Sequence, residues 1–93
     1  MDKLKSMQVF VHVVENGSFR NAANHFDMSA TMIGKHIQFL ESALDTCLLH
    51  RTTRKQSLTE SGQVYYDECK RILADILHAE NRIQTLENGG TKI

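Results

Sequence analysis

The sequence of 93 residues predicts one small, mainly α-helical domain. We expect three helices, a short two-stranded hairpin and a long C-terminal helix. The chain contains no proline and only five glycines, a composition that suits helices and disfavours an all-β design. Apolar residues recur at helical spacing along most of the chain, and Ser or Thr residues stand where helix N-caps are expected.

The first two helices are short and are separated by a helix-stopping glycine. Residues 2–16 form the first amphipathic stretch, which Gly17 is expected to end. Ser18 then caps a second helix over residues 19–26. Apolar residues at helical spacing define the inward faces, and they are Leu4, Met7, Phe10, Val11 and Val14, followed by Ala22, Ala23 and Phe26.

The third helix is expected over residues 30–44, with Ser29 as its cap. Its apolar residues step by four, three and four, and they are Ile33, Ile37, Leu40 and Leu44. The opposite face carries Thr31, Lys35, Gln38 and Ser42. A capped short helix, a tight turn and a longer capped helix are typical of a helix-turn-helix. From this pattern alone, DNA binding and an ordinary helical corner both remain open.

Residues 48–58 break the helical period and predict a hairpin with a basic tip at 51–56. Leu48, Leu49 and Leu58 flank the polar stretch, and no acidic residue occurs within 46–59. The tip brings together Arg51, Arg54 and Lys55, with hydroxyl groups on Thr52, Thr53 and Ser57. Such a cluster is commonly a solvated loop. Beside a helix-turn-helix, however, its cations and hydroxyls suit a phosphate backbone.

The last helix is expected over residues 60–87, with Thr59 as its cap. Its length would be roughly 42 Å, which exceeds the width of the preceding 59-residue unit. It carries an apolar seam with heptad steps of four and three: Tyr65, Cys69, Ile72, Ile76, Ala79, Ile83 and Leu86. We expect a partner helix from a second copy to cover this seam. The alternative is that the seam lies on residues 1–59 over its whole length.

Composition narrows the function classes. The formal net charge is zero, but residues 1–59 carry +2 and residues 60–87 carry −3. Cys47 and Cys69 are interpreted as reduced and half-buried. We expect His36 and His50 to contact phosphate or solvent, because the histidine and cysteine spacings match no metal site. No catalytic constellation, cofactor motif, signal peptide or membrane span is predicted.

Three segments together resemble a known family: "FVHVVENGSFRNAANHF", "KHI..LE" and "LLHRTTRKQSLTESG". They resemble the N-terminal domain of LysR-type transcriptional regulators over nearly all of residues 2–87. The resemblance implies a bacterial, cytoplasmic regulator with a winged helix-turn-helix over 1–59 and a dimerisation helix over 60–87. Residues 88–93 would begin a hinge to an effector-binding domain outside this chain.

The resemblance also implies where double-stranded DNA binds. The third helix would enter the major groove, and the wing would follow the minor groove and the backbone. The implied DNA-binding residues are Arg20, Ser29, Ala30, Thr31, Met32, Gly34, Lys35, Gln38, Arg51, Thr52, Thr53, Arg54 and Lys55. The seam would form the homodimer interface.

The sequence departs from the family pattern on the base-reading surface. Members usually follow the cap serine with Gln-Pro, where this chain has Ala30 and Thr31, and they have a serine in place of Gly34. Asp45 stands where the family generally has Gly. Thr31 and Met32 are expected to contact thymine methyl groups instead. The alternative function is a protein-interaction module that forms heterodimers with another regulator through the seam.

Overall fold

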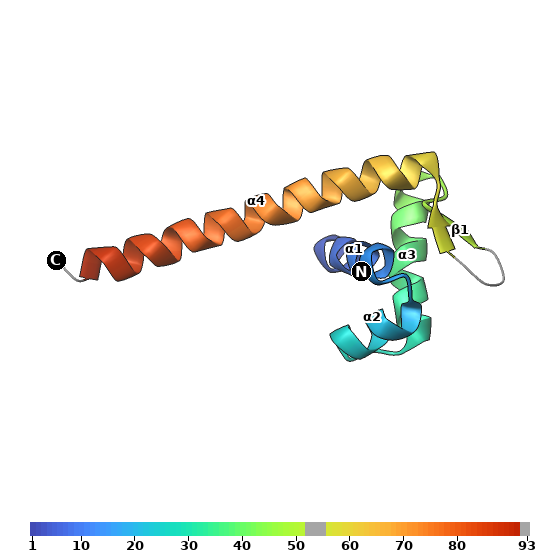
Figure 1. Ribbon diagram of the computed structural model, residues 1–93, viewed down its shortest axis with the longest axis horizontal. Helices are drawn as coiled ribbons and strands as arrows, with labels where there is room; N and C mark the ends of the chain where they lie inside the picture. The colour runs from blue at the N-terminus through green and yellow to red at the C-terminus, as the bar shows by residue number, and fades with distance from the viewer. Residues whose placement is uncertain (52–55, 92–93) are drawn as a thin grey trace.

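The computed structural model describes the backbone of residues 1–51 and 56–91 and the side chains of residues 1–50 and 57–87. Within these ranges it contains four helices and one antiparallel hairpin (Figure 1). The elements are α1 (Lys3–Asn16), α2 (Phe19–Phe26), α3 (Ala30–Leu44), β1 (Leu49–Arg51), β2 (Gln56–Leu58) and α4 (Glu60–Thr91). The mainly helical fold class and the order of elements predicted from the sequence are therefore confirmed.

The predicted caps set the helix boundaries. Gly17 ends α1 in the left-handed conformation at φ 66°, which glycine adopts without a Cβ clash. The hydroxyl of Ser18 accepts a hydrogen bond from the Asn21 amide, and that of Ser29 accepts one from the Met32 amide, each at 3.1 Å. Sequence reasoning missed a further cap: the Asp2 carboxylate accepts from the first amides of α1.

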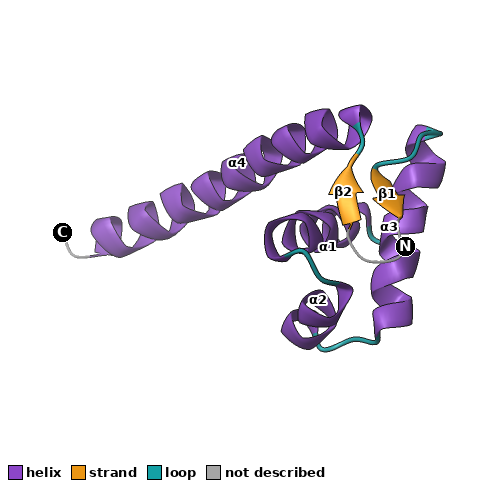
Figure 2. Ribbon diagram, turned by 45° about the vertical axis from the view of Figure 1, so that its right-hand side comes forward, coloured by secondary structure: helices purple, strands orange, loops and turns teal. Residues whose placement is uncertain are grey.

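The core forms where α1 crosses α3, with α2 packed against both (Figures 1 and 2). Its largest fully buried side chains are Val9, Phe10, Val13, Ile33, Ile37, Leu40 and Leu48. The four-three spacing on α3 therefore marks the buried face, as predicted, except at its last member. Leu44 is 43% exposed, because α3 ends there and its side chain borders an open groove toward α4.

The hairpin is confirmed, and it lies beside α3 in both views (Figures 1 and 2). Leu49 pairs with Leu58, and His50 pairs with Ser57. The predicted basic tip, with Arg54 and Lys55, lies outside the described residues. Leu48 and Leu49, just before and within β1, are buried and anchor the hairpin to the helical core.

Helix α4 leaves the core and projects, giving the molecule a longest dimension of 59 Å (Figure 1). The Thr59 hydroxyl accepts from the Gly62 amide at 2.9 Å, which confirms the predicted cap. The helix runs to Thr91, beyond the predicted end at residue 87. The adjacent glycines at 89–90 lower helix propensity by about 1 kcal/mol each, a local cost that does not by itself end a helix.

The apolar seam divides into two parts, which corrects its assignment as one interface. Cys69 is fully buried in its own chain, and the ring of Tyr65 lies 5.7 Å from that of Phe10 on α1. Every described residue from Leu77 to Glu87 is exposed. The first turns of α4 therefore complete the core, while Ile72, which is 38% exposed, and the later part of the seam are left for a partner. A heptad pattern cannot separate the two, because the same stripe suits either contact.

Candidate nucleic-acid interface

The outer face of α3 is exposed along most of its length. Thr31, Lys35, Gln38 and Ser42 all face solvent, opposite the buried stripe of the same helix. Ala30 and Met32 in the first turn are exposed as well, while the Ser29 hydroxyl is occupied in capping the helix. This face offers one cation, several small or polar groups and one thioether, a set suited to the groove of a duplex.

Gly34 differs from its neighbours on α3, because it is half-buried. A Cβ atom at this position would lie 3.6 Å from the ring of Phe19 at the start of α2. The position therefore belongs partly to the contact between α2 and α3, not wholly to the exposed face. Because 3.6 Å is an ordinary contact distance, the packing does not require a glycine here. Compared with the family's usual serine, Gly34 only removes a hydroxyl group from this edge.

The other predicted cations are described only in part. Arg20 is exposed in the first turn of α2. The backbone of Arg51 lies in β1, but its side chain is outside the described part of the chain, as are Thr52, Thr53, Arg54 and Lys55. The structure thus brings α2, α3 and the base of the hairpin together, and the wing's own cations remain a sequence prediction.

Glu41 links α3 to the hairpin, a role that sequence reasoning missed. Its carboxylate accepts hydrogen bonds from the Leu48 amide at 2.8 Å and the Leu49 amide at 3.4 Å. The Leu48 carbonyl in turn accepts from the Thr59 amide at 3.0 Å. These bonds satisfy buried backbone groups at both ends of the hairpin and fix its base relative to α3. The signal available in the sequence was Glu41 itself, at the end of the segment "KHI..LE".

The prediction that His36 contacts phosphate or solvent is wrong, because the side chain is buried between α3 and α1. Its side chain is 5% exposed, and its Nδ1 lies 2.7 Å from the hydroxyl oxygen of Ser6 on α1. Burial lowers the pKa of His36 below its ordinary value, and the nearby charge of Lys5 lowers it further. Only His50, which is exposed on β1, fits the original expectation.

The junction between α1 and α4 carries a small charged cluster. Glu15 accepts hydrogen bonds from Lys70 at 2.7 Å and from the hydroxyl of Tyr66 at 2.8 Å. The Lys70 hydrogen bond is the main cause of a lowered pKa for Glu15, with Tyr66 next. This cluster joins the base of the projecting helix to α1, so it helps to set the direction in which α4 leaves the domain.

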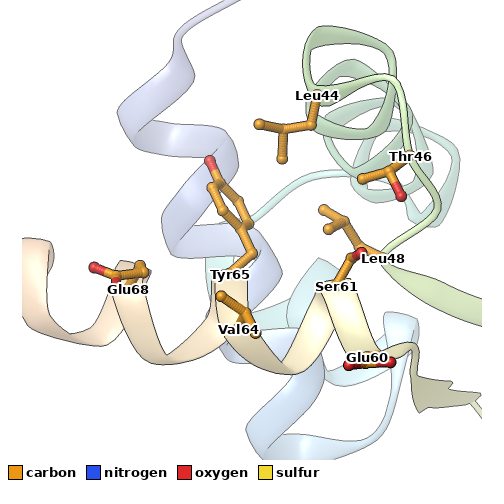
Figure 3. A pocket seen from close by; sticks show the side chains of 8 residues that line it. All are labelled: Leu44, Thr46, Leu48, Glu60, Ser61, Val64, Tyr65 and Glu68. Atoms are coloured by element: carbon orange, nitrogen blue, oxygen red, sulfur yellow. The ribbon is translucent and has the colours of Figure 1, made fainter.

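A groove at the junction of α3 and α4 has different chemistry from the outer face of α3. It measures about 420 Å³ and lies between the end of α3 and the start of α4, where Leu44 and Tyr65 face each other (Figure 3). Its lining includes Glu60 and Glu68 but no histidine, cysteine or cationic side chain. An apolar groove with acidic side chains does not suit a phosphate backbone, which favours the α3 face instead.

Among the described residues, two further features are absent. No cluster of three or more His, Cys, Asp or Glu side chains is placed to hold a metal ion. No helix in the same part of the chain is both long and apolar enough to cross a membrane.

Comparison with known proteins decides the family. The model for bacterial regulatory helix-turn-helix proteins of the lysR family matches residues 4–63. The chain belongs to this family. The match covers α1 from its second residue onward, then α2, α3 and the hairpin, and it ends just after α4 begins.

Curated relatives of this lysR-family chain include bacterial transcriptional regulators. An HTH-type transcriptional regulator of Xanthomonas campestris pv. campestris is 43% identical over 86 residues, which is 92% of this chain and 25% of the relative. The HTH-type transcriptional activator AaeR of Escherichia coli K12 is 40% identical over 88 residues, 95% of this chain and 28% of the relative. The chain thus spans about a quarter of the length of these relatives.

Solved lysR-family structures share the fold. The DNA-binding domain of BenM in complex with catB site 1 DNA has a TM-score of 0.86 at 28% identity, covering 94% of this chain and 96% of that one. The DNA-binding domain of CbnR in complex with DNA has a TM-score of 0.83 at 28% identity, covering 94% and 99%. The likeness extends over α4 as well as the helix-turn-helix, so the projecting helix is part of the shared architecture.

One departure from the lysR-family pattern now has a structural basis. Asp45, where the family generally has Gly, ends α3 in the left-handed conformation at φ 54°. Glycine adopts this conformation freely, while Asp is among the few other residues that tolerate it. The departure therefore preserves the backbone at some cost in strain.

Proposed function

We propose that this chain is the DNA-binding part of a bacterial transcription regulator, which binds double-stranded DNA as a homodimer. One observation carries the proposal: the exposed face of α3 stands on a fold that matches two lysR-family domains solved with DNA. The role needs no catalysis, cofactor or metal. A regulator of this kind works in the bacterial cytoplasm, where its DNA is.

Different side chains contact different parts of the DNA in this proposal. The N-terminal half of α3 enters the major groove, where Thr31 and Met32 contact thymine methyl groups and Gln38 reaches a base edge. Lys35 and Arg20 bind phosphate oxygens on either side. The wing, with Arg51, Arg54 and Lys55, follows the adjacent backbone and minor groove. Base readout then depends on Thr31 and Met32, because the family's usual Gln-Pro after the cap serine is Ala30 and Thr31 here.

The projecting part of α4 supports dimerisation. Leu77 is 58% exposed, Ile83 is 60% exposed and Leu86 is 71% exposed, and each is a large apolar side chain. Monomeric proteins rarely leave such a row uncovered, so a second copy is the expected cover. Two-fold pairing would present two copies of α3 to two half-sites on one duplex.

Salt-dependent binding to duplex DNA tests the proposal. A pool of random-sequence duplexes is titrated with the wild type, with Lys35→Ala and with Arg82→Ala, which removes an exposed cation from the projecting part of α4. Loss of one phosphate contact should lower the slope of log K against log salt by about one for Lys35→Ala. Arg82→Ala should keep the wild-type slope. Equal slopes for all three proteins would contradict the placement of α3 on DNA.

Sequence selection tests base readout separately. Duplexes recovered with the wild type should differ in preferred sequence from those recovered with Thr31→Ala or Met32→Ala. Uniform weakening on every duplex, with an unchanged preference, would argue that these side chains do not read bases.

A heterodimerising protein-interaction module remains the second candidate, and the exposed later part of the seam also favours it. This candidate makes the opposite prediction for DNA: the chain would associate through α4 and yet bind no duplex, even at low salt.

A further inference from the structure

A series of hydrogen bonds connects α3 to the start of α1. His36 Nδ1 lies 2.7 Å from Ser6 Oγ, and both side chains are buried. The Ser6 hydroxyl donates its only proton to the carbonyl oxygen of Asp2, 3.0 Å away. The proton in the bond between His36 and Ser6 is therefore carried by Nδ1, and the imidazole donates to the serine oxygen.

This series of hydrogen bonds ends at Asp2, the residue that caps α1. The Asp2 carbonyl also accepts from the Ser6 amide at 2.9 Å, while its carboxylate accepts from Leu4 and Lys5 amides. One side chain of α3 is thereby fixed to the first turn of α1. On α3, His36 is flanked by Lys35, which faces outward, and stands two residues before Gln38. A displacement of α3 at His36 would therefore move the DNA-facing side chains beside it.

The surroundings favour the neutral imidazole. Besides removal from water, the positive charges of Lys5 and the amino terminus oppose an added proton, while the Asp2 carboxylate partly offsets them. All three charged groups come from the N-terminal segment packed against His36. On its own helix, the neighbouring Lys35 faces solvent.

We propose that His36 and Ser6 are positioning residues for DNA binding: their hydrogen bond holds α3 against α1, and a second proton, added at Nε2, places a positive charge in this buried site, releases α3 and weakens binding in acid. The inference rests on the proposed DNA-binding function. In this inference, His36 does not contact DNA itself but determines the position in which α3 meets the DNA.

The direction of the pH effect follows from linkage. In the closed arrangement the pKa of His36 is lowered, whereas a released, hydrated imidazole regains its ordinary pKa of about 6.5. Above that pH both arrangements are neutral, so pH has no effect through this residue. As the pH falls below about 6.5, the released arrangement binds the proton more readily and gains population. DNA affinity is then lost on the acid side.

The experiment compares pH profiles of DNA affinity. The probe is the tightest-binding duplex recovered from the random pool at pH 8, titrated with the 93-residue protein at pH 8.0 and 5.5. The variants are His36→Gln, which does not titrate, and His78→Gln as a matched control on an exposed histidine of the projecting part of α4. Between the two pH values, wild type and His78→Gln should lose up to about tenfold more affinity than His36→Gln, the effect of one pKa unit.

The wild-type titration at pH 8 tests the proposed function alone, so its failure is distinguishable from failure of this inference. Parallel profiles for wild type and His36→Gln would overturn the inference, as would a relative gain of wild-type affinity in acid. Circular dichroism at pH 5.5 provides the remaining check: loss of helix in the wild type would reduce His36 to a purely structural role. Should His36→Gln not fold at pH 8, His36→Met replaces it in the same comparison.

Discussion

The carbonyl oxygen of Leu48 occupies the space that a Cβ atom on Gly62 would need. The first turn of α4 therefore rests directly on the backbone that leads into β1. This close approach, together with the hydrogen bond from the Thr59 amide to the same carbonyl, sets the angle between the hairpin and α4. It also explains in physical terms why a glycine ends the "LTESG" run.

Replacing Gly62 by alanine should destabilise the fold by about 2 kcal/mol or more, because backbone must move to admit the methyl group. Urea unfolding followed by circular dichroism measures the change. Gly34→Ala is the matched control: its methyl group would meet Phe19 at an ordinary 3.6 Å, so the gain in helix propensity should stabilise it by up to about 1 kcal/mol. Equal effects of the two substitutions would refute the steric assignment.

The cluster of Glu15, Lys70 and Tyr66 should give an acid-dependent contribution to stability. Since the pKa of Glu15 is lowered in the folded chain, the contribution is fully present above the unfolded pKa of about 4.3. It is lost as the pH falls through the lower folded value. Thermal melts between pH 7 and pH 3 should therefore fall more steeply for the wild type than for Glu15→Gln. Glu80→Gln, on the projecting part of α4, should follow the wild-type curve, and a curve like that of Glu15→Gln would contradict this.

The two cysteines should react at very different rates. Cys47 is exposed, whereas Cys69 is buried, and burial raises the pKa of its thiol to about 11. Since the thiolate is the reactive form, an alkylating reagent at pH 8 should modify Cys47 quickly and Cys69 only after unfolding. Mass spectrometry counts the modified thiols, and Cys47→Ser should abolish the fast reaction. Rapid modification of both residues would show that α4 separates readily from the core.

Dimerisation should depend on the exposed part of the seam. Ile83→Glu places a charge where a partner helix is expected, so sedimentation equilibrium should give a monomer with unchanged helix content. Gln84→Glu introduces the same charge at the next residue, off the seam, and should remain dimeric. A wild-type chain that is monomeric at high concentration would remove the basis of this prediction.

Local chemistry let the sequence predict most of the fold. Ser18, Ser29 and Thr59 each cap the helix that follows, and Gly17 ends the first helix in a conformation that suits it. The apolar period of α3 separated its buried stripe from its outward face. These features depend on neighbours within a few residues, which is the range that periodicity and capping rules describe.

The errors arose where distant segments meet. His36 was expected at the surface because a lone histidine on a helix carries no sign of its partner, yet Ser6 lies 30 residues away and buries it. Cys69 was assigned to a partner helix because a heptad seam looks the same whether it covers its own core or another chain. Glu41 and Gly62 likewise have roles only through the backbone of Leu48.

By itself, the sequence determined the helices, their caps, the hairpin and the family to which the chain belongs. The tertiary structure alone decided which part of α4 completes the core, which histidine is withdrawn from solvent and which backbone group requires a glycine. The physical reason is that capping and periodicity are local properties of the chain. Burial, in contrast, depends on where the packed helices finally lie.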